Sequence, residues 1–123
     1  MLTLAPLKDR IEIKKVFDEK KIEFDEYSGV VTAVCGNDTL GLCLYNLTDE
    51  SITIMYIEPL TDIPLADGIL RSTLHVAAER SIMKAYYAET VPQDFLETIK
   101  FIKSYQDKTL DIDKLFKSCC NCS

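Results

Sequence analysis

Residues 52–81 read ITIMYIEPLTDIPLADGILRSTLHVAAERS, and this stretch decides the fold. It opens with an apolar, strand-like run from Ile52 to Ile57, which Pro59 follows closely. After a loop that contains Pro64, apolar residues recur at helical spacing and predict a helix from about Asp67 to Ser81. A strand that leads into a long amphipathic helix is typical of an α/β protein.

The residues before this stretch predict one helix and three further strands. Met1 to Leu7 alternates loosely and suits a first strand, whereas apolar residues in Lys8 to Phe24 recur at helical spacing. The runs Val30 to Cys35 and Leu40 to Tyr45 join the run at 52–57 through turn residues, so we expect an antiparallel meander. Because these runs are apolar on both faces, we expect helices to cover both sides of the sheet.

Three shorter elements are predicted after the long helix. Lys84 to Ala88 suits a short strand, and Gln93 to Lys100 suits a helix that Pro92 opens. Thr109 to Phe116 suits a last strand. The predicted order is therefore strand, helix, three-strand meander, long helix, strand, helix, strand.

Composition narrows the classes of function. A chain of 123 residues fits one domain, to which we assign residues 1–117, followed by a Cys-rich tail at 118–123. A net charge of −6 with scattered Lys and Arg argues against nucleic acid as a partner. There is neither a membrane-length apolar run nor the pattern of a signal peptide, so we expect no membrane partner and a cytoplasmic location.

The predicted order resembles the GNAT superfamily of acetyl-CoA-dependent N-acetyltransferases. Several local features stand where that family has its own: Ile57-Glu58-Pro59, Gly68-Ile69, Leu74 with Ala77-Ala78, and Ser81-Ile82. The resemblance covers most of the chain. It implies a mixed, mostly antiparallel central sheet flanked by helices on both faces.

The resemblance also implies a site for acetyl-CoA. In the family, bare backbone amides at the start of the long helix close on the cofactor's pyrophosphate. The residues at those positions are Ala66, Asp67, Gly68 and Ile69, and the resemblance places Ile57, at the end of the preceding strand, beside the pantetheine arm of the cofactor. The family's glycine-rich loop is altered here, because Ala66 replaces its first glycine, Ile63 its polar leader, and Pro64 carries no amide hydrogen. Asp67 also suits an N-cap of the helix, and we favour this interpretation.

Glu58 is the candidate catalytic residue, as a general base toward an acceptor amine or water. The plainer interpretation is a solvent-facing strand end. Leu96 stands where the family has a tyrosine that protonates the departing thiolate. Only one substantial helix fits between Lys8 and Phe24, so an acceptor pocket would be shallow or completed by a second copy in a homodimer.

The cysteines carry a separate hypothesis. Cys119, Cys120 and Cys122 could share a soft metal or sense oxidation, although a thiol tail without metal is the default and we assign no metal ligand. Cys35 and Cys43 are expected to pack as small apolar residues. His75, the sole histidine, is expected on the surface of the long helix.

Two functions therefore stay open. The first is transfer of an acetyl group from acetyl-CoA to a small-molecule or protein amine. The second is a non-catalytic GNAT-like binding or interaction module, whose thiol tail binds metal or senses redox state.

Overall fold

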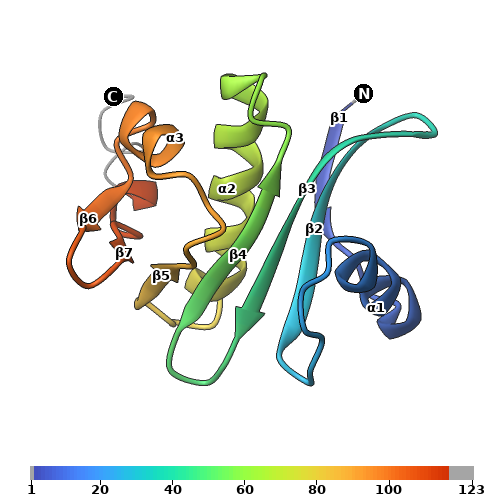
Figure 1. Cartoon of the computed structure of the whole chain (residues 1–123), viewed down its shortest axis with the longest axis horizontal. Coiled ribbons are helices and arrows are strands. Elements are labelled where there is room, and N and C mark those ends of the chain that lie inside the picture. Colours follow the sequence, from blue (N-terminus) through green and yellow to red (C-terminus); the bar gives the residue numbers. More distant parts are fainter. Residues whose placement is uncertain (1, 117–123) are drawn as a thin grey trace.

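A computed structural model describes residues 2–116 of the chain (Figure 1). Its seven strands form one sheet in the order β1-β2-β3-β4-β5-β7-β6. The elements in chain order are β1 (Leu2–Pro6), α1 (Arg10–Glu19), β2 (Ser28–Cys35), β3 (Asp38–Leu47), β4 (Ile52–Glu58), α2 (Ile63–Ala78), β5 (Ala85–Tyr87), α3 (Gln93–Thr98), β6 (Ile102–Ser104) and β7 (Thr109–Leu110).

The predicted meander is confirmed. β1, β2, β3 and β4 pair in sequence, each antiparallel to the next. Gly36 has a φ of 64° in the two-residue turn between β2 and β3, a backbone region in which glycine is favoured. β4 and β5 are parallel, with α2 as the crossover between them. The predicted fold class, a mostly antiparallel sheet flanked by helices, is therefore correct.

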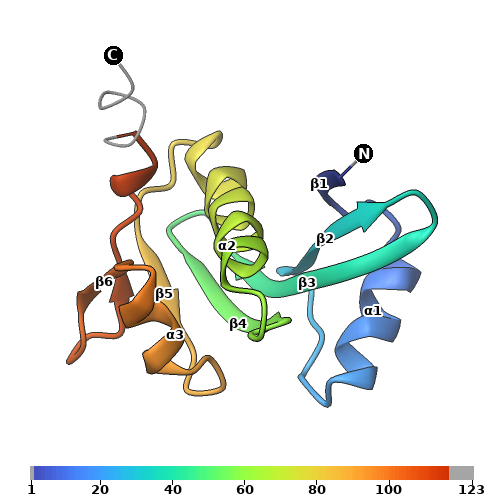
Figure 2. The same ribbon diagram turned by 90° about the horizontal axis from the view of Figure 1, so that it is seen from above.

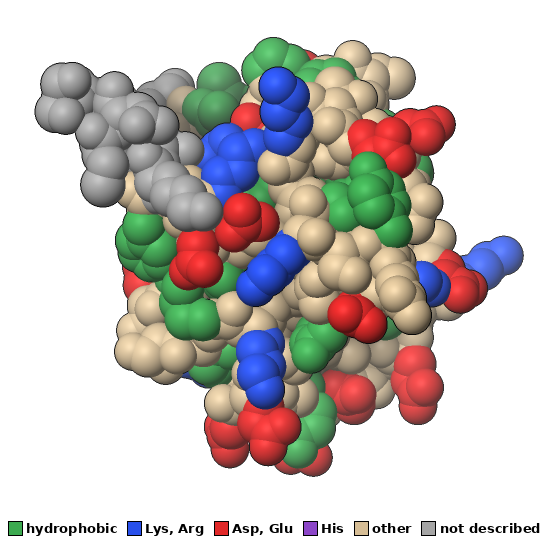
Figure 3. Space-filling view, turned by 90° about the vertical axis from the view of Figure 1, so that its left-hand side faces the viewer, with side chains coloured by type: hydrophobic (Ala, Val, Ile, Leu, Met, Phe, Trp, Pro, Cys, Tyr) green, Lys and Arg blue, Asp and Glu red, His purple; other side chains and the backbone are tan. Residues whose placement is uncertain are grey.

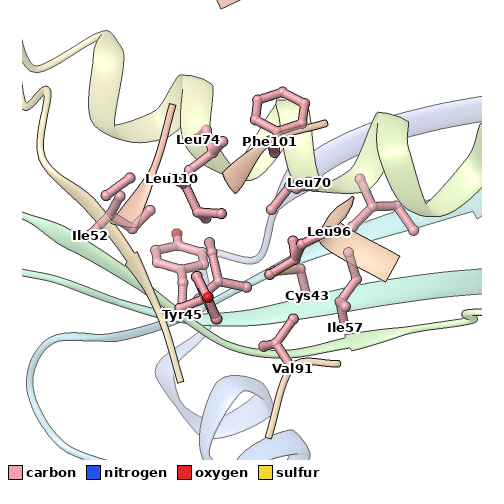
Figure 4. Close-up of a cluster of buried hydrophobic side chains, with 14 of the residues drawn as sticks. Cys43, Tyr45, Ile52, Ile57, Leu70, Leu74, Val91, Leu96, Phe101 and Leu110 are labelled. Carbon is pink, nitrogen blue, oxygen red and sulfur yellow. The ribbon is translucent and has the colours of Figure 1, made fainter. Parts of the chain in front are cut away.

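Helices cover the sheet on both faces, as expected (Figure 2). On one face, α1 buries Ile13 and Phe17 against Val30 and Leu44. On the other face, α2 and α3 pack over the main core, whose buried strand residues come from β2, β3, β4, β5 and β7 (Figure 4). Partly buried apolar residues of β1 and β6 pack at its edges. Consecutive residues of β2 and β3 alternate between the two clusters, because successive strand side chains point to opposite faces.

The long helix begins earlier than predicted. α2 spans Ile63–Ala78 instead of 67–81, and its N-cap is Asp62 rather than Asp67. The reason is local: Asp62 accepts a hydrogen bond from the Leu65 amide, and Pro64 lies in the first turn, where a missing amide hydrogen costs nothing. The residues predicted to form a loop are therefore the first turns of a helix.

The C-terminal part differs from the prediction. The expected strand at 109–116 is wrong: only Thr109–Leu110 is a strand, and it pairs with β6, which was not predicted. A turn at 105–108 joins β6 to β7, with Lys108 at a φ of 53°. Both strands are too short to produce a readable alternating pattern. Residues 117–123, with the tail cysteines, lie outside the described part.

The two described cysteines differ in environment. Cys43 is buried in the core as predicted, and burial raises the pKa of its thiol to about 12. Cys35 is exposed at the end of β2, so its predicted packing in the core is wrong. Within residues 2–116, no three His, Cys, Asp or Glu side chains are grouped to hold a metal ion. In the same part of the chain, no helix is long and apolar enough to cross a membrane.

Candidate functional site

β4 and β5 separate halfway along β4. Their pairing runs from Ile52 with Ala85 to Ile54 with Tyr87, where β5 ends. Directly after Ile54, β4 contains a bulge: Ile54 and Tyr56 each pair with a residue of β3, whereas Met55 between them has no partner there. Beyond this point the Met55 carbonyl accepts a hydrogen bond from the Thr90 hydroxyl. The second half of β4 is therefore free of a strand on this side.

A shallow groove of about 280 Å³ lies between the start of α2 and the length of α3. Its lining residues are Leu60, Ile63, Pro92, Asp94, Phe95 and Thr98. The walls are mainly apolar, and the one charged side chain that lines the groove in the described part is the carboxylate of Asp94. A groove of this composition offers no cation to a phosphate.

The first turn of α2 borders this groove, and its Leu65 and Ala66 amides already have acceptors. Pro64 has no amide hydrogen, Leu65 donates to the Asp62 side chain at 3.2 Å, and Ala66 donates to the Asp62 carbonyl at 2.9 Å. Amides further along the helix, from position 67 onward, donate to carbonyls four residues earlier. The predicted pyrophosphate-binding amides thus already have partners within α2.

The side chains of the predicted cofactor residues do not converge on one cavity. Ala66 and Ile69 are fully buried in the core, and Ile57 is 3% exposed. Asp67 forms an ion pair with Arg71 one turn along the helix, at 3.0 Å. Gly68 faces β1, where a Cβ atom would lie 3.7 Å from Leu4 Cδ1. These positions serve packing and helix structure, and none of them lines the groove.

Glu58 belongs to a small polar cluster on the face of the sheet that α1 covers. Tyr56, two residues earlier on β4, donates a hydrogen bond from its hydroxyl to Glu58 Oε1 at 2.8 Å. Lys20, at the end of α1, places its ammonium 2.6 Å from the same oxygen. Lys20 also lies 5.3 Å from the centre of the Tyr56 ring. The sequence indicated Glu58 but not its two partners.

The cluster sets the protonation of each member. Partial burial raises the pKa of Glu58, but the hydrogen bonds from Lys20 and Tyr56 and the charge of Lys20 outweigh it, so the pKa is lowered. The hydrogen bond to Glu58 raises the pKa of Lys20 and of Tyr56. At neutral pH the carboxylate is therefore charged and paired with an ammonium ion, which makes it a weak base.

Leu96 and His75 lie where the sequence predicts a departure from catalytic chemistry and a surface position, respectively. Leu96 is fully buried in the core (Figure 4), so no hydroxyl occupies the place of the family's tyrosine. His75 lies exposed on α2, as expected, with Nε2 3.3 Å from a carboxylate oxygen of Glu79. On the face that carries α3, β6 and β7, acidic and basic side chains are interspersed (Figure 3).

Several solved structures resemble the fold of this chain. Neither protein-family profiles nor curated protein sequences yield a match. A ribosomal-protein-alanine N-acetyltransferase from Brucella melitensis biovar Abortus 2308 has a TM-score of 0.57 at 15% identity, over 81% of this chain and 89% of that one. Tetrahymena GCN5 has a TM-score of 0.55 at 11% identity, over 88% and 92%. The chain has the GNAT fold.

A third structure with this fold contains the cofactor. The putative N-acetyl transferase YhhK from E. coli, bound to coenzyme A, has a TM-score of 0.52 at 15% identity, over 82% of this chain and 87% of that one. Because the chain spans most of each of these structures, the GNAT fold is present nearly from end to end. At such identities the likeness concerns the fold and not the activity.

Proposed function

We propose that this chain is a non-catalytic GNAT-fold binding or interaction module of the cytoplasm that does not take up acetyl-CoA. The observation that carries the proposal is the start of α2. Asp62 occupies two amides of the first turn, Pro64 removes a third, and a carboxylate stands where an anion would have to approach. The negative charge of Asp62 at the helix N-terminus, beside two amides that already have acceptors, disfavours the binding of a pyrophosphate group.

Two further observations support the loss of catalysis. Glu58 is paired with Lys20 at 2.6 Å, and this pairing lowers the pKa of the carboxyl, so Glu58 is a poor base toward an acceptor amine. Leu96 supplies no acidic proton for a departing thiolate. The general base, the general acid and the phosphate-binding amides thus all differ from what the GNAT resemblance implies. The seven-stranded sheet itself is intact.

The charge of the groove indicates what the module accepts. Apolar walls with Asp94 suit a neutral or cationic group better than a polyanion such as coenzyme A, and the net charge of −6 acts in the same direction. Calorimetric titration of the reduced protein with acetyl-CoA tests the proposal. We expect no saturable heat at millimolar ligand, and micromolar binding would overturn it.

Acetyl transfer to an amine is the second candidate, and the separation of β4 from β5 favours it. The bulge at Met55 and the free second half of β4 leave room beside a strand for an extended thioester chain. A small-molecule or protein amine would then approach near Glu58, in a pocket that a second copy of the chain could complete. Release of coenzyme A in the presence of a panel of amines would support this candidate, provided that Glu58→Gln abolishes the release.

A further inference from the structure

A second cavity lies at the opposite end of the sheet from Glu58, where no prediction from the sequence placed a site. Pairing between β1 and β2 stops at Pro6 with Val31, whereas β2 starts three residues earlier at Ser28. The start of α1 and the end of α2 enclose the space that this leaves. The cavity has a volume of about 250 Å³. Its lining residues are Leu7, Lys8, Arg10, Ile13, Glu26, Tyr27, Ser28, Gly29, Tyr45, Leu47 and Arg80.

The charges around this cavity are mainly positive, in contrast to the acidic chain as a whole. Lys8, Arg10 and Arg80 line it, against the single carboxylate of Glu26. Neither Lys8 nor Arg80 has an ion-pair partner within residues 2–116. The three cations come from separate parts of the chain, so the fold alone brings them together.

Arg10 is held rigidly at the cavity wall. Its guanidinium donates to the carbonyl of Ser28 at 2.6 Å and to the carbonyl of Asp25 at 2.8 Å, and it stacks 4.8 Å from the centre of the Phe24 ring. All three partner groups are uncharged, so they fix the guanidinium without neutralising it. A preorganised cation of this kind binds an anion with little loss of side-chain entropy.

Tyr45 supplies a hydrogen-bond donor at the same place. The residue is only 7% exposed and lines the cavity, with its ring across Gly29, where a Cβ atom would lie 2.6 Å from the hydroxyl oxygen. No described residue forms a hydrogen bond with this hydroxyl, and no buried side-chain oxygen or nitrogen among the described residues lacks a partner, so the hydroxyl oxygen is open to the cavity. Burial raises the pKa of Tyr45, so the hydroxyl keeps its proton at neutral pH and can donate it.

We propose that this cavity binds the oxyanion group of a small molecule, with the Tyr45 hydroxyl and the Arg80 guanidinium as donors and Arg10 and Lys8 as further positive charge. A carboxylate and a phosphate share the required chemistry: oxygen acceptors that carry negative charge. The volume admits such a group with a few attached carbon atoms. The inference is independent of the proposed function, because the cavity and the groove at Asp94 share no residue.

The test is an NMR titration of the full chain with inorganic phosphate and, separately, with acetate, at constant ionic strength. We expect saturable shifts of the Gly29 and Tyr45 amides with at least one of the two anions, and the tighter one identifies the ligand's oxyanion. Arg80→Gln should weaken binding about tenfold, and Tyr45→Phe about fivefold. Lys15→Gln removes the same charge outside the cavity and should change the affinity less than about twofold.

Shifts that rise linearly with both anions, without saturation, would overturn the proposal. So would a loss of affinity that is equal in Arg80→Gln and Lys15→Gln, because that would indicate net charge rather than a built site. Arg80 is exposed and Tyr45→Phe keeps the buried ring, so both variants are expected to fold. Their spectra without anion check this directly.

Discussion

The side chain of Asp62 accepts a hydrogen bond from the amide of Leu65 at 3.2 Å, and this bond fixes where α2 begins. In consequence the helix starts before Ala66, the residue that stands in place of the family's first glycine. The GNAT sheet is retained, but the amides that would meet a pyrophosphate belong to a closed helical turn.

The first prediction concerns this cap. Asp62→Ala should lower the free energy of unfolding by about 1 kcal/mol, because the Leu65 amide loses its acceptor. Asp62→Asn keeps an acceptor oxygen and should cost far less. Urea denaturation measures both, with Thr61→Ala as the neighbouring control. Equal stability of Asp62→Ala and the unaltered chain would show that the cap does not hold the helix start.

Replacing Gly68 and Gly41 by alanine should change the stability of the protein in opposite directions. Gly68 lies inside α2 with ordinary contact distance to Leu4, so Gly68→Ala should stabilise by about 0.5–1 kcal/mol through better helix propensity. At Gly41 a Cβ atom would lie 2.6 Å from the Glu58 carbonyl oxygen, so Gly41→Ala should destabilise by about 1–3 kcal/mol. Thermal unfolding of the pair compares the two, and a loss of stability in Gly68→Ala would contradict the helical placement of residue 68.

The Lys20–Glu58 pair predicts a pH dependence. Because the folded-state pKa of Glu58 is lowered, the pair contributes stability above the carboxyl's unfolded pKa and loses it as the pH falls through the folded pKa. Lys20→Gln should raise the pKa of Glu58 and remove this part of the acid sensitivity, by under about 1 kcal/mol for a partly exposed pair. Carboxyl-detected NMR titration gives the pKa directly. An unchanged pKa in Lys20→Gln would refute the pairing.

Cys43 should resist alkylation in the native state. With a pKa of about 12 and a fully buried side chain, its thiol forms almost no thiolate at pH 8. Site-resolved mass spectrometry after iodoacetamide treatment should find Cys35 labelled and Cys43 unlabelled, with both labelled in urea. Rapid native labelling of Cys43 would indicate that the core opens.

Much of the fold could be predicted because long elements have clear periods. The runs at 30–35, 40–45 and 52–57 carry the apolar character and turn residues of a meander, and the strands observed contain them. The pair β6 and β7 could not be predicted, because two or three residues give no period. The start of α2 was predicted too late because Asp67 and Asp62 are both residues favoured at N-caps, and the Asp62–Leu65 hydrogen bond that decides between them is seen only in the structure.

The candidate site was predictable in part. Tyr56 and Glu58 share a face of β4 by strand alternation, so their contact could have been inferred from sequence. Lys20 could not, because its position depends on how α1 crosses the sheet. The positive charges of the second cavity could not be predicted either. Lys8 and Arg80 are distant in sequence, and neither belongs to a motif that indicates a binding site.

The most direct test of the account compares acetyl-CoA with acetylpantetheine, which keeps the thioester arm but lacks the pyrophosphate. If the first turn of α2 cannot bind phosphate, the pyrophosphate of acetyl-CoA adds no affinity. Calorimetry should then find that acetyl-CoA binds no more tightly than acetylpantetheine. Gly68→Asp should then leave both titrations unchanged. Micromolar binding of acetyl-CoA, much tighter than acetylpantetheine and abolished by Gly68→Asp, would contradict the account and establish a working cofactor site.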